Sequence, residues 1–263
     1  DRATPAELME QLRERLPQAK PLEIRRAQER LLRIRDTRAH LAALEAAGLR
    51  VDYHAADVTD PAAVAAVAAR CPRIDAVIHA AGVEESQLIP AKTAASFDRV
   101  FDTKVAGARN LLAALQDREV RTFIAFSSVT ARFGNAGQAD YTAANDMLGK
   151  MLLAWRAGDP RRVVRVMGWT AGEGAGMATR ETVQKVLRER GLRFLPLAKG
   201  VARFLDELRD ASATEVVISS RDRAFDPDGL LPPDPAAADG RVSSFLDRRL
   251  EAGPQRAVFA RVL

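Results

Sequence analysis

The stretch Thr122-Phe-Ile-Ala-Phe-Ser-Ser128, together with Gln138-Ala-Asp-Tyr-Thr-Ala-Ala-Asn145, decides the fold of this chain. The apolar part of the first stretch is typical of a buried strand, so Ser128 is expected just beyond the strand's carboxyl end. The second stretch opens a run rich in Ala, Leu and Met. This composition predicts a helix, with Tyr141 and Asn145 one turn apart on one face. A hydroxyl at a strand end and a phenol on the next helix can meet over one substrate atom.

Strands and helices alternate along most of the chain. Asp60 followed by Pro61 is typical of a helix start, because the carboxylate caps the first turn and proline fits its first position. Strands joined by helices of about ten or more residues imply right-handed crossovers, so we expect an α/β fold with a doubly wound parallel sheet. Besides the helices that begin at Pro61 and Gln138, the predicted strands are residues 50–55, 74–79, 121–126, 163–167 and 215–218, and the predicted helices are residues 5–16, 22–48, 95–116, 180–190 and 198–209.

The beginning of this pattern departs from a complete doubly wound sheet. Such a sheet has its first strands at the centre, in the order 3-2-1-4-5-6, with a Gly-rich phosphate turn after the first. No strand is predicted before residue 50 and no such turn before Asp57. We therefore expect a sheet without its N-terminal strand, Gly-rich turn, helix and strand, which would lie upstream in the natural polypeptide or elsewhere in the assembly. A degenerate domain that never had this segment is the alternative.

The segments of the chain differ in composition. Residues 1–49 form a helical lead-in, and residues 50–220 carry the alternating strands and helices. Residues 221–241 are rich in Pro and Asp, which is typical of a linker. Residues 242–263 contain two strand-like runs that either form a terminal hairpin or open a following domain.

Composition excludes several classes of protein. A chain of 263 residues with 47% hydrophobic and 29% charged residues is typical of a soluble globular domain. No apolar run approaches about 18 residues, so no membrane segment is expected, and the first residues contain no signal peptide. The single Cys71 fits a reducing cytoplasm. The net charge of +5 comes from arginines interleaved with carboxylates, which argues against a nucleic-acid partner. His40 and His54 show no metal-ligand spacing.

The segment around Tyr141 resembles the active-site signature of the short-chain dehydrogenases/reductases, which have a Rossmann-like fold. It is most similar to the ketoreductase domains of type I polyketide synthases and polyunsaturated fatty acid synthases. Most short-chain reductases carry Tyr-x-x-x-Lys, whereas this chain has Tyr141-x-x-x-Asn145. The ketoreductases place the lysine on an earlier helix, where Lys104 occupies the matching position. Ser128 completes a set that matches the family at every position.

The resemblance implies an NADPH-dependent reduction of a β-ketoacyl thioester, carried by an acyl carrier protein, to the β-hydroxyacyl thioester. It implies a cytoplasmic multidomain synthase, neighbouring synthase domains as partners, and allows a homodimer formed through the parent synthase. A dehydratase domain that opens at residue 242 would fit this arrangement. The alternatives are a non-catalytic reductase-like domain that organises neighbouring synthase domains, and a free-standing reductase of small alcohols. Structural relatives of the first kind usually lose the catalytic residues, which this chain keeps.

The resemblance also assigns roles to the catalytic set. Tyr141 is expected to protonate the developing alkoxide, and Ser128 to donate a hydrogen bond to the carbonyl oxygen. Lys104 is expected to lower the pKa of the Tyr141 phenol through its positive charge. Asn145 is expected to hold Lys104 or a chain of waters in place.

The residues expected to bind the cofactor follow two predicted strands. In similar reductases the residue that matches Asp57 contacts the adenine, although an aspartate there could also organise its own turn. The turn Ala80-Ala81-Gly82 has small residues that let the backbone approach the ribose. His79, just before it, is expected to be a buried strand residue and not a catalytic base. The predicted cofactor-binding set is Asp57, Val58, Ala80, Ala81, Gly82, Lys104 and Tyr141.

Overall fold

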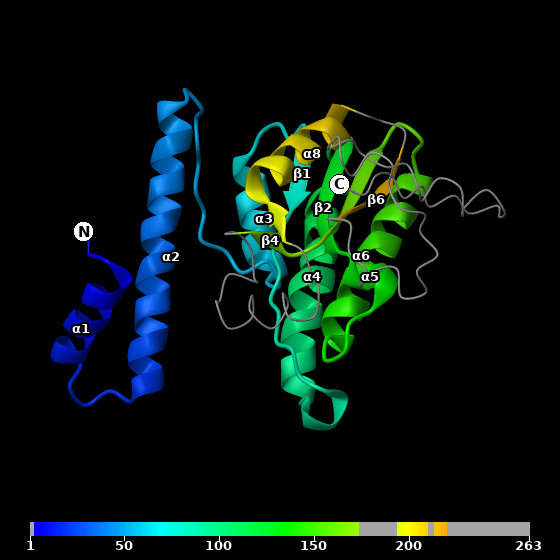
Figure 1. Cartoon of the computed structure of the whole chain (residues 1–263). Coiled ribbons are helices and arrows are strands. Elements are labelled where there is room, and N and C mark those ends of the chain that lie inside the picture. The colour runs from blue at the N-terminus through cyan, green and yellow to red at the C-terminus, as the bar shows by residue number, and fades with distance from the viewer. Residues whose placement is uncertain (1–2, 174–193, 210–212, 220–263) are drawn as a thin grey trace, which may run out of the picture. The chain divides into compact units, whose positions relative to one another are not determined.

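The structure, a computed structural model, describes residues 3–173, 194–209 and 213–219, which fall in two compact units, Asp1–Ala55 and Ala56–Leu263 (Figure 1). The predicted linker and the strand-like runs that follow it lie outside the described residues, as does the predicted helix at 180–190. All the candidate catalytic and cofactor-binding residues lie within the described ranges.

The first unit is a helical hairpin. α1 (Pro5–Arg15) and α2 (Pro21–Ala46) both begin with proline. Proline fits the first helical position because a backbone N–H at that position would have no acceptor within the helix, so its absence costs nothing. The two helices pack against each other, with Leu12 and Ile24 buried. Both predicted helices are therefore confirmed.

The second unit is built on a four-stranded parallel sheet in the order β1-β2-β3-β6. Because all its strands run in one direction, their carboxyl ends meet at one edge of the sheet. That edge is where ligands bind in open α/β sheets. The strands are β1 (Ala76–His79), β2 (Thr122–Ser128), β3 (Val163–Trp169) and β6 (Glu215–Ile218).

Helices cover both faces of this sheet, which gives two apolar cores. Side chains alternate along β2, so Phe123 packs into one core with residues of α4 and α6, and Ile124 packs into the other, with Phe204 of α8 beside it. The predicted α/β fold with a doubly wound parallel sheet is confirmed. Its helices are α3 (Pro61–Arg70), α4 (Ala94–Ala114), α6 (Ala139–Ala157) and α8 (Leu197–Arg209).

The predicted strand at 50–55 is wrong, since these residues have no strand pairing in the structure. A strand requires a neighbour for its backbone hydrogen bonds. In the described part of the chain, no strand pairs with the outer edge of β1, and Ile78 on that strand is 54% exposed. The extended segment before α3 therefore has no sheet to join.

The structure also contains short elements that were not predicted, because they are too brief for any periodicity to appear. β2 runs through Ser128, so this residue ends the strand and does not follow it. The unpredicted elements are α5 (Thr130–Phe133), a single 3₁₀ turn at Ile89–Ala91, and the short parallel pair β4 (Gly172–Glu173) and β5 (Leu195–Pro196).

Candidate active site

The residues of the predicted catalytic set come from three elements of the second unit. Ser128 ends β2, Tyr141 and Asn145 lie one turn apart on α6, and Lys104 lies on α4. All four are buried, with exposed fractions between 1% and 8%. Asn145 Nδ2 donates to the Tyr141 carbonyl at 2.8 Å, and Lys104 Nζ donates to the Phe126 carbonyl of β2 at 2.7 Å. The Tyr141 phenol interacts with the Ser128 and Asn145 side chains.

Ser128 is oriented by a residue that sequence reasoning missed. Its Oγ accepts hydrogen bonds from the Thr130 backbone N–H at 3.2 Å and from the Thr130 hydroxyl at 3.0 Å. Because these contacts occupy the acceptor side of the oxygen, the hydroxyl hydrogen of Ser128 is left to donate. The signal was a serine followed two residues later by a threonine, which is typical of a local side-chain turn.

The pKa of the Tyr141 phenol is higher than that of an ordinary tyrosine. Burial of the ring is the main cause that raises its pKa, and the Glu84 carboxylate raises it further. Interactions with the Asn145 and Ser128 side chains oppose this rise without reversing it. Lys104 is not among the groups that shift the pKa of this phenol, since its ammonium is directed at two backbone carbonyls. Its expected effect on Tyr141 stays a prediction. The phenol starts as an acid with its proton in place.

Lys104 directs its ammonium at two backbone carbonyls. Besides Phe126, it donates to the Ala81 carbonyl at 3.3 Å, which leaves one N–H without an acceptor among the described residues. Burial lowers the pKa of Lys104 to about 8. A Cβ on Gly82 would lie 3.2 Å from the lysine Nζ, so only glycine leaves this approach unhindered.

Of the two roles expected of Asn145, the structure shows no hydrogen bond to Lys104, and the role in holding a chain of waters stays a prediction. The side-chain Nδ2 of Asn145 donates to the backbone carbonyl of Tyr141, and its backbone carbonyl accepts from the Ser127 hydroxyl at 3.3 Å. Its Oδ1 is buried and has no hydrogen-bond partner among the residues the structure describes. A buried acceptor without a partner is costly, so a water or a ligand is expected to complete it.

His79 is structural, as predicted from its place at the strand end. Burial lowers its pKa to about 4, so the imidazole is neutral at pH 7. Its Nε2 lies 3.0 Å from the Lys104 carbonyl oxygen, to which it donates in the neutral form. This bond fixes the helix that carries Lys104 against β1.

The loop of Asp57 is also held by a residue that sequence reasoning missed. Asp57 is exposed, and its Oδ1 accepts from the Thr59 backbone N–H at 2.9 Å and hydroxyl at 2.8 Å, which lowers its pKa. The carboxylate thus organises its own turn, the alternative left open by the sequence. Asn110 of α4 donates to the carbonyls of Val58 and Thr59 at 3.0 and 2.9 Å.

Gly107→Ala is expected to disturb this loop. The new Cβ would lie 3.0 Å from both methyl groups of Val58 and 3.2 Å from His79 Cε1. Overpacking of this kind costs about 1–3 kcal/mol, so the melting temperature of the chain should fall. Val58→Ala in the same chain removes both methyl groups and should restore most of the loss. Additive losses in the double variant would contradict the contact.

Other kinds of site find no support within the described ranges. Those residues contain no group of three His, Cys, Asp or Glu side chains placed to hold a metal ion, and none of their helices is long and apolar enough to cross a bilayer.

Comparison with known proteins places this geometry in a family. The family model described as KR domain matches residues 25–171. A polyunsaturated fatty acid synthase polypeptide of Thraustochytrium sp. is 30% identical over 210 residues, which are 78% of this chain and 7% of that protein. The spectinabilin polyketide synthase system protein NorA' of Streptomyces orinoci is 36% identical over 58% of this chain and 4% of its own length. The chain thus spans a small fraction of these relatives.

Solved structures of polyketide synthase ketoreductases are similar to this chain in both fold and sequence. An A-type ketoreductase from a modular polyketide synthase superposes with a TM-score of 0.65 at 29% identity, over 74% of this chain and 42% of its own. An N-terminal ketoreductase from the macrolactin assembly line gives a TM-score of 0.59 at 27% identity, over 69% of this chain and 36% of its own.

Proposed function

Because the chain belongs to the KR domain family of polyketide and polyunsaturated fatty acid synthases, we propose that it reduces the β-carbonyl of an acyl thioester to a hydroxyl with NADPH. The acyl chain would be presented by an acyl carrier protein of the same synthase. The observation that carries this proposal is the meeting of a hydrogen-donating Ser128 and a protonated Tyr141 at the carboxyl edge of the sheet.

The two hydroxyls have complementary tasks. Ser128 accepts both Thr130 contacts, so its hydroxyl acts as a donor, which would turn from the Tyr141 oxygen to the substrate carbonyl oxygen and stabilise charge that develops there. Tyr141 donates its proton to the same oxygen as the alkoxide forms. Since the pKa of the phenol is raised, its proton is present throughout the neutral range. The unpartnered Asn145 Oδ1 is placed on the same helix turn to bind a water that returns a proton to the phenol.

The residues near the β1 turn fit a nicotinamide cofactor. The third N–H of Lys104, which has no acceptor in the described part of the chain, would donate to a ribose hydroxyl, and the turn Ala80-Ala81-Gly82 carries only small side chains. Asp57 and the Val58 amide would lie at the adenine, and Tyr141 at the ribose. When bound, the reduced nicotinamide supplies the hydride, while the protein supplies orientation and the proton. The choice of NADPH over NADH rests on the resemblance.

The proposed partners follow from the same family. They are the carrier protein with its β-ketoacyl chain, the neighbouring synthase domains and, through the parent synthase, a second copy of the chain. The rival is a non-catalytic domain that organises its neighbours. The catalytic set favours the reductase, because Ser128, Tyr141, Lys104 and Asn145 are all retained and all buried in the same unit.

Turnover distinguishes the two. The full-length polypeptide in which this chain occurs is expected to oxidise NADPH when given a β-ketoacyl thioester of N-acetylcysteamine, and to form the β-hydroxyacyl thioester. The measurement is the loss of NADPH absorbance together with chromatography of the product. NADPH that binds without any reduction of the thioester would favour the structural role instead.

A further inference from the structure

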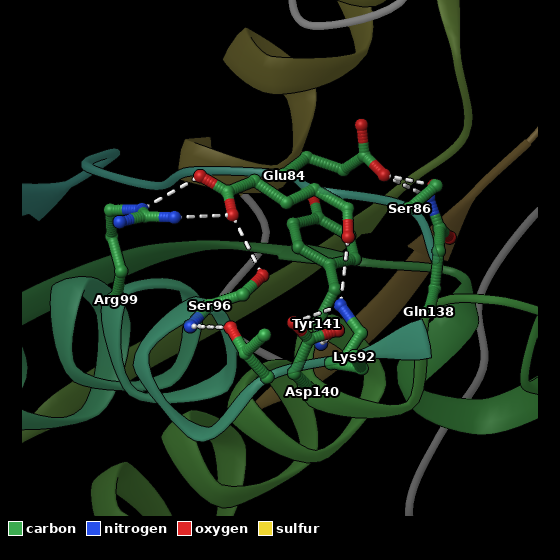
Figure 2. A network of polar contacts seen from close by, with 10 residues as sticks. Glu84, Ser86, Lys92, Ser96, Arg99, Gln138, Asp140 and Tyr141 are labelled. Atoms are coloured by element: carbon green, nitrogen blue, oxygen red, sulfur yellow. Dashed lines mark hydrogen bonds and ion pairs between the residues drawn. The ribbon is translucent and has the colours of Figure 1, made fainter. Parts of the chain in front are cut away.

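A buried ion pair lies next to Tyr141 in the sequence and in space. Lys92 Nζ donates to Asp140 Oδ2 at 2.6 Å, and the two side chains are only 5% and 1% exposed. The pair joins residues that are 48 positions apart. Figure 2 shows the Lys92 ammonium directed at the Asp140 carboxylate.

The second oxygen of the Asp140 carboxylate binds the backbone of Tyr141, the proposed general acid. Asp140 Oδ1 accepts the Tyr141 backbone N–H at 2.9 Å. The N-cap residue of α6, Gln138, makes no side-chain capping bond. The first backbone N–H groups of α6 therefore lack the acceptor that an N-cap side chain usually supplies. Asp140 supplies a negative charge in that first turn, where the helix dipole favours it. Its two oxygens therefore link the first turn of α6, through the Tyr141 N–H, to the Lys92 ammonium.

The other end of the pair holds the segment that follows the β1 turn. Lys92 Nζ also donates to the Glu85 carbonyl at 2.7 Å. The Glu85 carboxylate is itself bound by Ser96 Oγ and, through two bonds, by Arg99, each at 2.7 Å. The Arg99 bonds are the main cause that lowers the pKa of Glu85 to about 2, so this anchor is charged throughout the neutral range.

Further bonds join the same segment to the loop before α6. Gln138 Nε2 donates to Glu84 Oε1 at 3.1 Å and to Ser86 Oγ at 3.2 Å (Figure 2). The Gln87 backbone N–H donates to the Gly137 carbonyl at 2.8 Å. The residues after the proposed cofactor turn are thus tied along their length to the residues before Tyr141.

We propose that Lys92 and Asp140 are positioning residues, which set the place of Tyr141 relative to the Ala80–Gly82 turn. This inference rests on the proposed function, because the turn and the phenol would hold the two reactants. A shift of about 1 Å between reacting groups can cost about 10²-fold in rate. A rigid link between the two sides of the site therefore acts on kcat.

Stability alone gives a weaker account of this pair. Replacing a buried ion pair by apolar side chains of similar volume is often neutral or stabilising, whereas breaking it by one substitution leaves an uncompensated buried charge and is strongly destabilising. The informative variant is therefore the double substitution Lys92→Met/Asp140→Leu, which removes both charges. The control is Arg203→Met/Glu207→Leu. It replaces an ion pair on α8 that is similarly buried, at 5% and 3% exposed, in which Arg203 also reaches Asp206 at 3.6 Å. Among the contacts of the described residues, none joins this pair to the Tyr141 segment.

The first measurement does not depend on activity. Hydrogen exchange of the full-length protein, followed by mass spectrometry, should show faster exchange in peptides that cover 138–145 for Lys92→Met/Asp140→Leu and wild-type exchange there for the control. Asp140→Asn keeps the size of the side chain but leaves the buried Lys92 ammonium without its carboxylate, so exchange in the same peptides should also be faster than in the wild type. Unchanged exchange in both Asp140 variants would overturn the proposal.

The second measurement is the kinetics of thioester reduction. Lys92→Met/Asp140→Leu should lower kcat by about 10²-fold with the KM for NADPH within about twofold of wild type, and the control should keep wild-type kcat. A double variant with faster local exchange and wild-type kcat would also overturn the positioning role. Wild-type protein without any turnover would instead refute the proposed function, and the exchange result would then decide the positioning of Tyr141 by itself.

Discussion

Tyr141→Phe is expected to lower kcat for reduction of a β-ketoacyl thioester by about 10²- to 10⁴-fold, the range that a positioned general acid supplies. The substitution removes one oxygen and keeps the ring, which is 8% exposed, so α6 should keep its fold. The wild-type phenol enters the reaction with its proton, because burial raises its pKa. The measurement is kcat and KM in the full-length polypeptide, with the dissociation constant of NADPH determined by fluorescence.

Tyr53→Phe is the matched control for this variant. The chain has two tyrosines, and Tyr53 is 60% exposed and lies in the first unit. Its replacement is expected to leave kcat and KM unchanged. Wild-type kcat in Tyr141→Phe would mean that another group delivers the proton, and the assignment of the acid would fail.

Lys104→Met is expected to lower kcat/KM by about 10²-fold, because it removes a charged donor from the site where charge develops. Above a pH of about 8, wild-type activity should also decline, since Lys104 loses its proton there. The variant has no proton to lose and should not show this decline. Parallel pH profiles of the two proteins above pH 8 would contradict a role for the ammonium.

The difference in stability between the wild type and Lys104→Met should change with pH in a defined direction. Folding lowers the pKa of Lys104 from 10.5 to about 8, so between these values the unfolded chain binds more protons and the wild-type free energy of unfolding rises with pH. This difference corresponds to roughly 3 kcal/mol. Methionine carries no charge, so any advantage of the variant in denaturant titrations should be largest below pH 8 and shrink toward pH 10. A constant difference would contradict the burial of a charged lysine.

The sequence predicted the central strands well because their signal is local. Strands buried on both faces appear as continuous apolar runs, and β2 and β3 were found within two residues at each end. The failed strand at 50–55 has a similar local pattern. Its pairing depends on a neighbouring strand, which no local pattern encodes. Two-residue strands such as β4 (Gly172–Glu173) are equally invisible to periodicity.

The candidate site was predictable where spacing along the chain decides it. Ser128 at a strand end and Tyr141 on the next helix follow from local sequence, and the structure buries both. The direction of the Tyr141 pKa was not predictable, since it depends on burial and on Glu84 from a distant loop. The Lys92–Asp140 pair gave no signal for the same reason, because its partners meet only after the chain has folded.

The most direct test of the account is the transfer of label from cofactor to product. The full-length polypeptide is given NADPH with deuterium at the transferred position and a β-ketoacyl thioester, and the product is analysed by mass spectrometry. We predict a β-hydroxyacyl thioester with one deuterium on its β-carbon, and almost none in the same time from Tyr141→Phe at equal NADPH occupancy. Product without deuterium, or equal labelling by the variant, would contradict the reductase site described at Ser128 and Tyr141.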